Sequence, residues 1–181
     1  MNKAENVLKD IENITKKHFL PIVGRKKGAL LEFLIKRYEP KKILEIGTLV
    51  GYSAILMAKH LNGYLISIDV NNNNKIAEEN IKKAGLKNIK LISGDAIELI
   101  PSLKEKFDFI FIDASKSEYL SYLKLLEKYN KIQKGSIIAA DNVKIFANRM
   151  KDYLEYVRNS GNYDSKYYDF VDDGVEVSIK K

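Results

Sequence analysis

The chain contains the stretch Phe107-Asp108-Phe109-Ile110-Phe111-Ile112-Asp113-Ala114-Ser115-Lys116, and further along the stretch Ile137-Ile138-Ala139-Ala140-Asp141-Asn142. Each is a short apolar run that ends in polar residues, which is typical of a strand covered on both faces of a sheet. In an open α/β sheet the ligand crevice lies beyond the carboxyl ends of the strands. We therefore expect Asp113, Asp141 and Asn142 to stand together at one edge of a parallel sheet.

Two carboxylates and one amide oxygen at such an edge predict a site for a divalent cation, because hard cations prefer oxygen ligands. Lys116 follows Asp113 closely and is a candidate base beside that cation. A single aspartate at a strand end is more often a cap or turn residue, and a single lysine there is often only solvated. The joint pattern favours a functional site.

Strand and helix patterns alternate on both sides of these runs, which predicts an α/β fold with a mainly parallel sheet. We expect seven strands, the last two forming an antiparallel hairpin, with helices on both faces in a doubly wound, Rossmann-like arrangement. The expected strands cover residues 41–47, 64–69, 89–92, 107–112, 137–141, 163–171 and 175–179. The expected helices cover residues 4–17, 24–38, 52–61, 75–84, a segment ending near 103, 117–129 and 146–159. Residues 71–74 are expected to form a polar loop.

The composition is that of one ordinary globular domain. The 181 residues, 45% hydrophobic and 30% charged, suffice for one core. We expect a single domain over 1–181, with N-terminal helices at 1–38 and the α/β core at 41–181. The absence of cysteine excludes disulfides, thiolate metal sites and cysteine nucleophiles. No stretch has the length of a membrane span, and the N-terminus lacks a signal-like apolar segment, so we expect a cytoplasmic protein.

The net charge of +7 raises the question of a nucleic-acid partner. Only four of the 31 basic residues are arginine, and lysine lacks the planar fork that suits bidentate phosphate contacts. A solvated, lysine-rich surface is the simpler interpretation. The run Arg25-Lys26-Lys27 is interpreted as a solvated helix start, and it would be the first basic patch to test if tRNA were a partner.

A second candidate site lies where the first core strand turns into a helix, at Glu45-Ile46-Gly47-Thr48-Leu49-Val50-Gly51-Tyr52-Ser53. Glycine in this turn lets the backbone approach a ligand closely. Asp69, at the next strand end, is placed to accept hydrogen bonds from ribose hydroxyls, and Asp95, after the third strand, to face an adenine edge. Asp69 is alternatively a helix cap.

The spacing of this turn differs from the G-x-G-x-x-G fingerprint of nicotinamide-binding proteins. It has a carboxylate, Glu45, ahead of its first glycine, and a carboxylate suits a ligand with an amino group better than a pyrophosphate. The turn therefore favours S-adenosylmethionine over NAD, and a Rossmann oxidoreductase is disfavoured.

These motifs together resemble the cation-dependent class I S-adenosylmethionine O-methyltransferases, a family that includes catechol, caffeoyl-CoA and bacterial tRNA 5-hydroxyuridine methyltransferases. The resemblance spans roughly Pro21 to Lys180 and includes the closing segment from Asp173 to Ile179. Its specific part is the pair of strand ends at Asp113 and at Asp141-Asn142.

The resemblance implies a role for each matching residue. Lys116 matches the catalytic lysine, and the implied metal ligands are Asp113, Asp141 and Asn142. The implied cofactor-binding residues are Glu45, Gly47, Thr48, Gly51, Ser53, Asp69, Asp95, Ala96 and Asp113. Glu45 would lie near the methionyl amine, Asp69 at the ribose, and Asp95 with Ala96 at the adenine.

The expected function is transfer of a methyl group from S-adenosylmethionine to a hydroxyl that a divalent cation holds on a catechol-like small molecule. Mg²⁺ is the first choice of cation, with Mn²⁺ or Ca²⁺ as alternatives. A tRNA 5-hydroxyuridine O-methyltransferase is the first alternative function, and a non-catalytic S-adenosylmethionine-binding protein is the second. The resemblance also suggests a homodimer, and the lack of a membrane-length apolar stretch predicts no membrane partner.

The chain departs from the family pattern around the acceptor. Ser115 stands where many relatives carry an acid, and the segment from Val143 to Asn148 is shorter than usual. The chain has no tryptophan to cover the acceptor. We therefore expect a shallow, open acceptor site.

Overall fold

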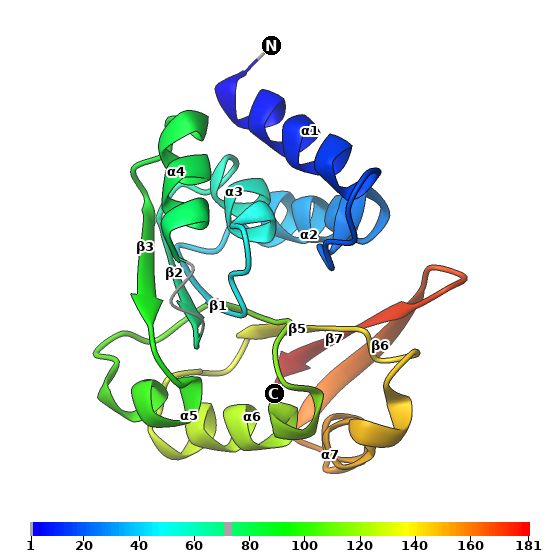
Figure 1. The fold of residues 1–181 in the computed structure, drawn as a ribbon. Coiled ribbons are helices and arrows are strands. Elements are labelled where there is room, and N and C mark those ends of the chain that lie inside the picture. Colours follow the sequence, from blue (N-terminus) through cyan, green and yellow to red (C-terminus); the bar gives the residue numbers. More distant parts are fainter. Residues whose placement is uncertain (1, 71–73) are drawn as a thin grey trace.

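The computed structural model describes residues 2–70 and 74–181, and its strands form one sheet in the order β3-β2-β1-β4-β5-β7-β6 (Figure 1). Neighbours from β3 to β5 are parallel, while β7 runs antiparallel to both β5 and β6. The strands are β1 Lys42–Ile46, β2 Tyr64–Asp69, β3 Ile89–Ser93, β4 Phe109–Ile112, β5 Ile137–Asp141, β6 Tyr163–Asp169 and β7 Gly174–Lys180. The predicted sheet, including its C-terminal hairpin, is confirmed.

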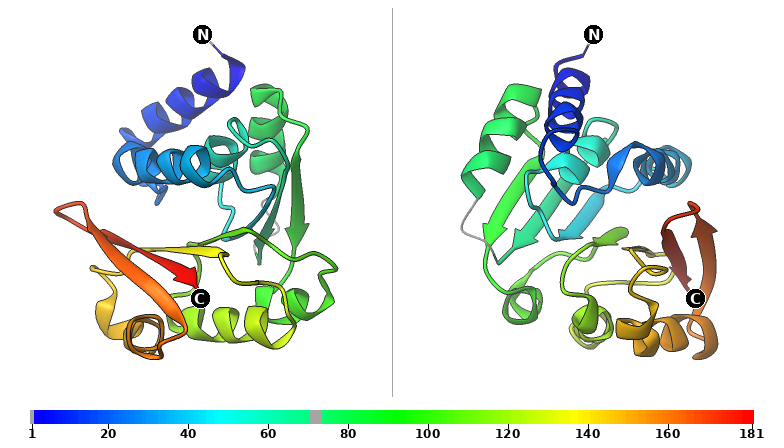
Figure 2. Two further views of the ribbon diagram at one scale, coloured as in Figure 1. Left: turned by 180° about the vertical axis from the view of Figure 1, so that it is seen from behind. Right: turned by 45° about the vertical axis from the view of Figure 1, so that its right-hand side comes forward.

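Helices cover both faces of the sheet. The α-helices are α1 Lys3–Thr15, α2 Gly24–Tyr38, α3 Tyr52–Ala58, α4 Asn74–Ala84, α5 Ala96–Leu99, α6 Tyr119–Lys128 and α7 Lys151–Asn159. Short 3₁₀ turns lie at Ile100–Ser102, Lys116–Glu118 and Ala147–Arg149. Helices α1 to α4 lie on one side of the sheet and α5 to α7 on the other, as the views in Figures 1 and 2 show.

The alternation of side chains along β4 explains the two layers. Phe109 and Phe111 belong to the core under α1 to α4, whereas Ile110 and Ile112 belong to the core over α5 to α7. All four side chains are fully buried. A strand with apolar residues on both faces is stable only between two covering layers, so this run dictates the doubly wound arrangement.

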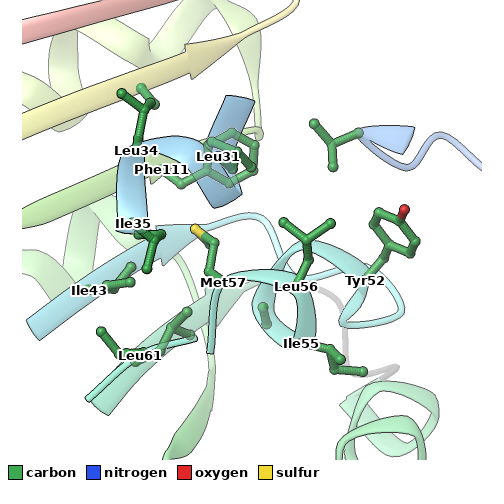
Figure 3. Packing of buried hydrophobic residues seen from close by; sticks show 14 of the residues in the cluster. Leu31, Leu34, Ile35, Ile43, Tyr52, Ile55, Leu56, Met57, Leu61 and Phe111 are labelled. Carbon is green, nitrogen blue, oxygen red and sulfur yellow. The ribbon is translucent and has the colours of Figure 1, made fainter. Parts of the chain in front are cut away.

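Helix α2 is held against the sheet by a close contact with α3. Leu31 and Leu34 of α2 point into the same cluster as Met57 of α3 and Phe111 of β4 (Figure 3). A Cβ atom at Gly28 would lie 2.9 Å from Leu56 Cδ1, so glycine permits this approach. The contact fixes the position of the first turn of α2 relative to the sheet.

Several predicted boundaries were wrong by a few residues, mainly where short 3₁₀ turns replace α-helix. The predicted helix over 146–159 begins only at Lys151, after a turn and the 3₁₀ segment Ala147–Arg149. The helix predicted from 52 to 61 ends at Ala58. Most of the predicted polar loop at 71–74 lies outside the described residues. Within the described ranges, no helix combines the length and apolarity needed to cross a membrane.

Candidate active site

The carboxyl ends of the five parallel strands open onto one large cavity of about 1010 Å³. Because the sheet order is β3-β2-β1-β4-β5, the residues after these strands follow one another along the cavity. Its lining includes Lys27, Gly47, Thr48, Ser53, Asp69, Asp95, Asp113, Lys116, Asp141, Asn142 and Asp173. Strand-end residues from both halves of the sheet therefore share one space.

The turn after β1 is built around Gly47 and Asp69. Gly47 has a φ of 103°, and a Cβ there would lie 2.0 Å from the carbonyl oxygen of Asp113, so only glycine fits. The Asp69 carboxylate accepts hydrogen bonds from the backbone N–H groups of Thr48, at 2.8 Å, and Leu49, at 2.9 Å. Asp69 thus holds the turn while also lining the cavity.

Asp95 and Ala96 lie at the far end of this half of the cavity. Asp95 caps α5 by accepting a hydrogen bond from the backbone N–H of Ile97 at 2.8 Å. Both residues line the cavity, in agreement with their predicted place after β3.

Glu45 is fully buried beneath the turn. Its Oε2 atom accepts a hydrogen bond from the Ser67 hydroxyl at 2.5 Å. Its Oε1 atom has no hydrogen-bond partner among the described residues. Burial raises the pKa of Glu45 to about 8, in spite of the nearby serine hydroxyls, and the Asp113 and Asp69 charges add to the rise. A buried, unpaired carboxyl oxygen suits a cationic ligand group.

Asp141 and Asn142 end β5 at the centre of the other half of the cavity. Asp141 is 1% exposed, and its Oδ1 has no hydrogen-bond partner in the described part of the chain, although Lys27 Nζ lies 2.6 Å away. Burial, followed by the Asp113 charge, raises the pKa of Asp141 against the opposing charge of Lys27. Asn142 adopts a left-handed φ of 63° and donates its Nδ2 to Asp173 Oδ2 at 2.6 Å.

Lys116 stands between the two acidic strand ends. Its Nζ donates to Asp113 Oδ1 at 2.8 Å and to the Tyr119 hydroxyl at 2.9 Å. Tyr119, fully buried, donates in turn to the backbone oxygen of Asp141 at 3.3 Å. The amine is therefore fixed against the Asp113 carboxylate and is linked through Tyr119 to the backbone of Asp141.

Apolar side chains line the rim next to Lys116 and Asn142. Phe19 and Leu20 come from the connection between α1 and α2, while Ile145 and Phe146 come from the turn after β5. Phe19 is 93% exposed and Ile145 is 57% exposed. Sequence patterns did not single out these residues, because they lie in irregular segments without a motif.

The structure brings together nearly all the predicted site residues. All of them line the cavity except Glu45 and Gly51. Glu45 lies behind the turn, and Gly51, with a φ of 81°, forms the start of α3 against Ala77. The interpretation of Lys27 as a solvated residue at a helix start was wrong. Lys27 forms buried ion pairs with Asp141 and Asp173.

The sheet order, the glycine turn after β1 and the acidic residues at successive strand ends define the class I S-adenosylmethionine-dependent methyltransferase fold. Comparison with solved structures agrees. An O-methyltransferase from Bacillus cereus, solved in complex with SAH, superposes with a TM-score of 0.86 at 26% identity and covers 97% of this chain and 91% of its own. An SAH-bound methyltransferase from Podospora anserina shares the fold, with a TM-score of 0.84 at 23% identity, covering 97% and 88%.

The chain belongs to the O-methyltransferase family, whose model matches residues 2–155. Catechol O-methyltransferase of Sus scrofa is 33% identical over 174 residues, covering 88% of this chain and 92% of the relative. Catechol O-methyltransferase B of Danio rerio is 37% identical over 172 residues. The match covers 87% of this chain but only 64% of the length of that relative. The predicted resemblance to S-adenosylmethionine-dependent O-methyltransferases is thereby confirmed.

Proposed function

We propose that this protein transfers the methyl group of S-adenosylmethionine to a hydroxyl of a catechol-like small molecule, with the help of a divalent cation. The observation that carries the proposal is the grouping of Asp113, Lys116, Asp141 and Asn142 in one cavity, between the glycine turn on one side and an apolar rim on the other. Cation dependence and the acceptor go beyond what family membership establishes.

The chain's own atoms fit a cation with oxygen ligands. Asp141 Oδ1 is buried and receives no hydrogen bond from a described residue, although the Lys27 ammonium lies 2.6 Å away, and the Asn142 amide nitrogen is already engaged by Asp173. The amide oxygen of Asn142 and the carboxylates of Asp113 and Asp141 would hold the ion. A cation there would act as a Lewis acid that stabilises negative charge on an acceptor oxygen. No group of three or more His, Cys, Asp or Glu residues that could hold a metal ion occurs in the described ranges. The proposed set consists of two carboxylates and one amide.

Lys116 would take the proton from the acceptor hydroxyl. As a neutral amine it has one lone pair, and its N–H groups can remain on Asp113 and Tyr119 while that lone pair faces the hydroxyl. The acceptor oxygen then forms its bond to the methyl carbon as the carbon–sulfur bond breaks. Rigid placement of the lysine between two strand ends contributes orientation.

The apolar rim is suited to a flat, largely hydrophobic acceptor. Phe19, Leu20 and Phe146 would contact its ring, and the polar groups below would contact its hydroxyls. Bound S-adenosylmethionine would supply the electrophilic methyl group, with Asp69 at its ribose and Asp95 at its adenine. The homodimer and the cytoplasmic location remain predictions.

Cofactor binding should depend on pH through Glu45. The pKa of Glu45 is about 8, so its carboxyl is protonated at lower pH in the cofactor-free protein. If its Oε1 receives the methionyl ammonium, binding favours the carboxylate and releases this proton. Affinity for S-adenosylmethionine should therefore rise about tenfold from roughly pH 6 to pH 7, while the ammonium itself stays protonated. Calorimetry in buffers of different ionisation enthalpy measures both effects. Glu45→Gln should bind weakly and without this pH dependence. A wild-type affinity that is flat over this range would contradict the role of Glu45.

The acceptor is tested by methyl transfer to matched dihydroxybenzenes. A cation there would favour acceptors with two adjacent hydroxyls. Catechol should therefore be methylated, and its 1,3-isomer, resorcinol, should react at least about a hundredfold more slowly. Undermodified tRNA is assayed beside them with the same labelled cofactor. Equal rates with the two isomers, or transfer to tRNA alone, would contradict a catechol-like acceptor.

A further inference from the structure

Lys27 belongs to the first turn of α2, yet its ammonium lies inside the candidate cation site. Its side chain is 13% exposed, and Nζ lies 2.6 Å from Asp141 Oδ1, 2.7 Å from Asp141 Oδ2 and 2.8 Å from Asp173 Oδ2. An ammonium at these distances is a fixed partner of two buried carboxylates. No step of the proposed methyl transfer uses it.

The fold delivers this lysine to the site rather than leaving it free to move. The neighbouring Gly28 meets Leu56 of α3 so closely that a Cβ would lie 2.9 Å from that side chain. Leu31 and Leu34, one and two turns further along α2, are buried in the core shown in Figure 3. The backbone of α2 next to Lys27 is therefore anchored by packing against α3 and the core.

Asp173 connects the lysine to the other cation ligand. The same Oδ2 atom that accepts from Lys27 also accepts from Asn142 Nδ2 at 2.6 Å, and Oδ1 accepts from the backbone N–H of Ile145 at 3.4 Å. With its nitrogen engaged, the Asn142 amide has only its oxygen left for a cation. Asp173 thus positions Asn142, and Lys27 supplies the positive charge that stabilises Asp173 beside Asp141.

We propose that Lys27 is a built-in competitor of the divalent cation: its ammonium neutralises Asp141 and Asp173 in the cation-free protein and thereby weakens cation binding at this site. The inference rests on the proposed cation site. The same charge opposes the ion once it is bound.

Two effects of removing the ammonium act in the same direction. Without it, two nearly buried carboxylates face each other uncompensated, which raises the free energy of the cation-free protein. In the cation-bound protein the ion itself compensates them, and the repulsion between ion and ammonium disappears. The free-energy difference between the two states, which is the binding free energy, must therefore favour binding more strongly.

The test is Mn²⁺ binding, measured by electron paramagnetic resonance of the free ion at about pH 8. Lys27→Met should bind Mn²⁺ at least about tenfold more tightly than the unmodified protein. Its melting temperature should fall by several degrees without the ion and recover when the ion is added. Lys27→Arg keeps the charge and should bind no more tightly than the unmodified protein. Lys26→Met removes an exposed charge from the same helix turn and serves as the matched control.

The outcomes separate this inference from the proposed function. Mn²⁺ binding by Lys27→Met that is equal to or weaker than that of the unmodified protein would overturn the competitor role while leaving the cation site in place. An equal gain in Lys26→Met would also overturn it, because the effect would then be general surface charge. If the unmodified protein binds no Mn²⁺, the cation site itself fails and the inference fails with it.

Discussion

Replacing Asp141 with asparagine is expected to lower the rate of methyl transfer by about a thousandfold or more, because a cation supplies several kcal/mol of charge stabilisation. The substitution keeps the shape of a side chain that is 1% exposed, but it removes the charge at the centre of the candidate cation site. Affinity for S-adenosylmethionine should change little, since Asp141 lies on β5, two strands from the glycine turn after β1. Initial rates and calorimetric cofactor binding measure the two quantities separately.

Asp164→Asn is the matched control for that experiment, because Asp164 is an exposed acid on β6. It should retain full activity. Mn²⁺ binding should be lost in Asp141→Asn and kept in the control. An Asp141→Asn protein that is folded and turns over within tenfold of the unmodified rate would show that the cation, if bound, contributes little.

The second large effect is expected at Lys116. Lys116→Met should reduce kcat by about a hundredfold to ten-thousandfold, the range typical of a lost general base. Cofactor affinity should change little, and Lys134→Met, at an exposed position, serves as the control. The decisive variant is Lys116→Arg, which keeps a positive charge for Asp113 but cannot give up a proton near neutral pH.

Lys116→Arg therefore separates a base from a structural cation. If Lys116 takes the acceptor proton, arginine should be nearly as inactive as methionine, and both proteins should melt close to the unmodified one. Recovery of most of the activity by arginine would assign Lys116 a purely structural role beside Asp113.

The strand ends could be predicted from sequence because buried parallel strands have a strong signature. Phe109 to Ile112 and Ile137 to Ala140 are continuous apolar runs, and the polar residue that ends each run must emerge at the sheet edge. The order of the strands then determines which of these residues share a cavity. The glycine turn at Gly47 was predictable because glycine lets the backbone approach a neighbour closely. In the structure a Cβ at Gly47 would lie 2.0 Å from the carbonyl oxygen of Asp113.

Lys27 and the apolar rim could not be predicted in this way. A lysine in the first turn of a helix is usually solvated. This one reaches Asp141 because α2 packs closely against α3 at the neighbouring Gly28. Phe19 and Ile145 lie in irregular segments, where no periodicity marks which side chains face a cavity. Asp173 carried a turn signal before Gly174, and its contact with Asn142 depends on pairing between distant strands.

The dependence of turnover on a divalent cation tests the central claim most directly. Labelled methyl transfer to catechol is measured after exhaustive chelation and again after Mg²⁺ is restored, with cofactor binding followed in parallel. The account predicts that activity disappears on chelation and returns with Mg²⁺, while S-adenosylmethionine remains bound throughout. Undiminished transfer in the chelated protein would contradict it.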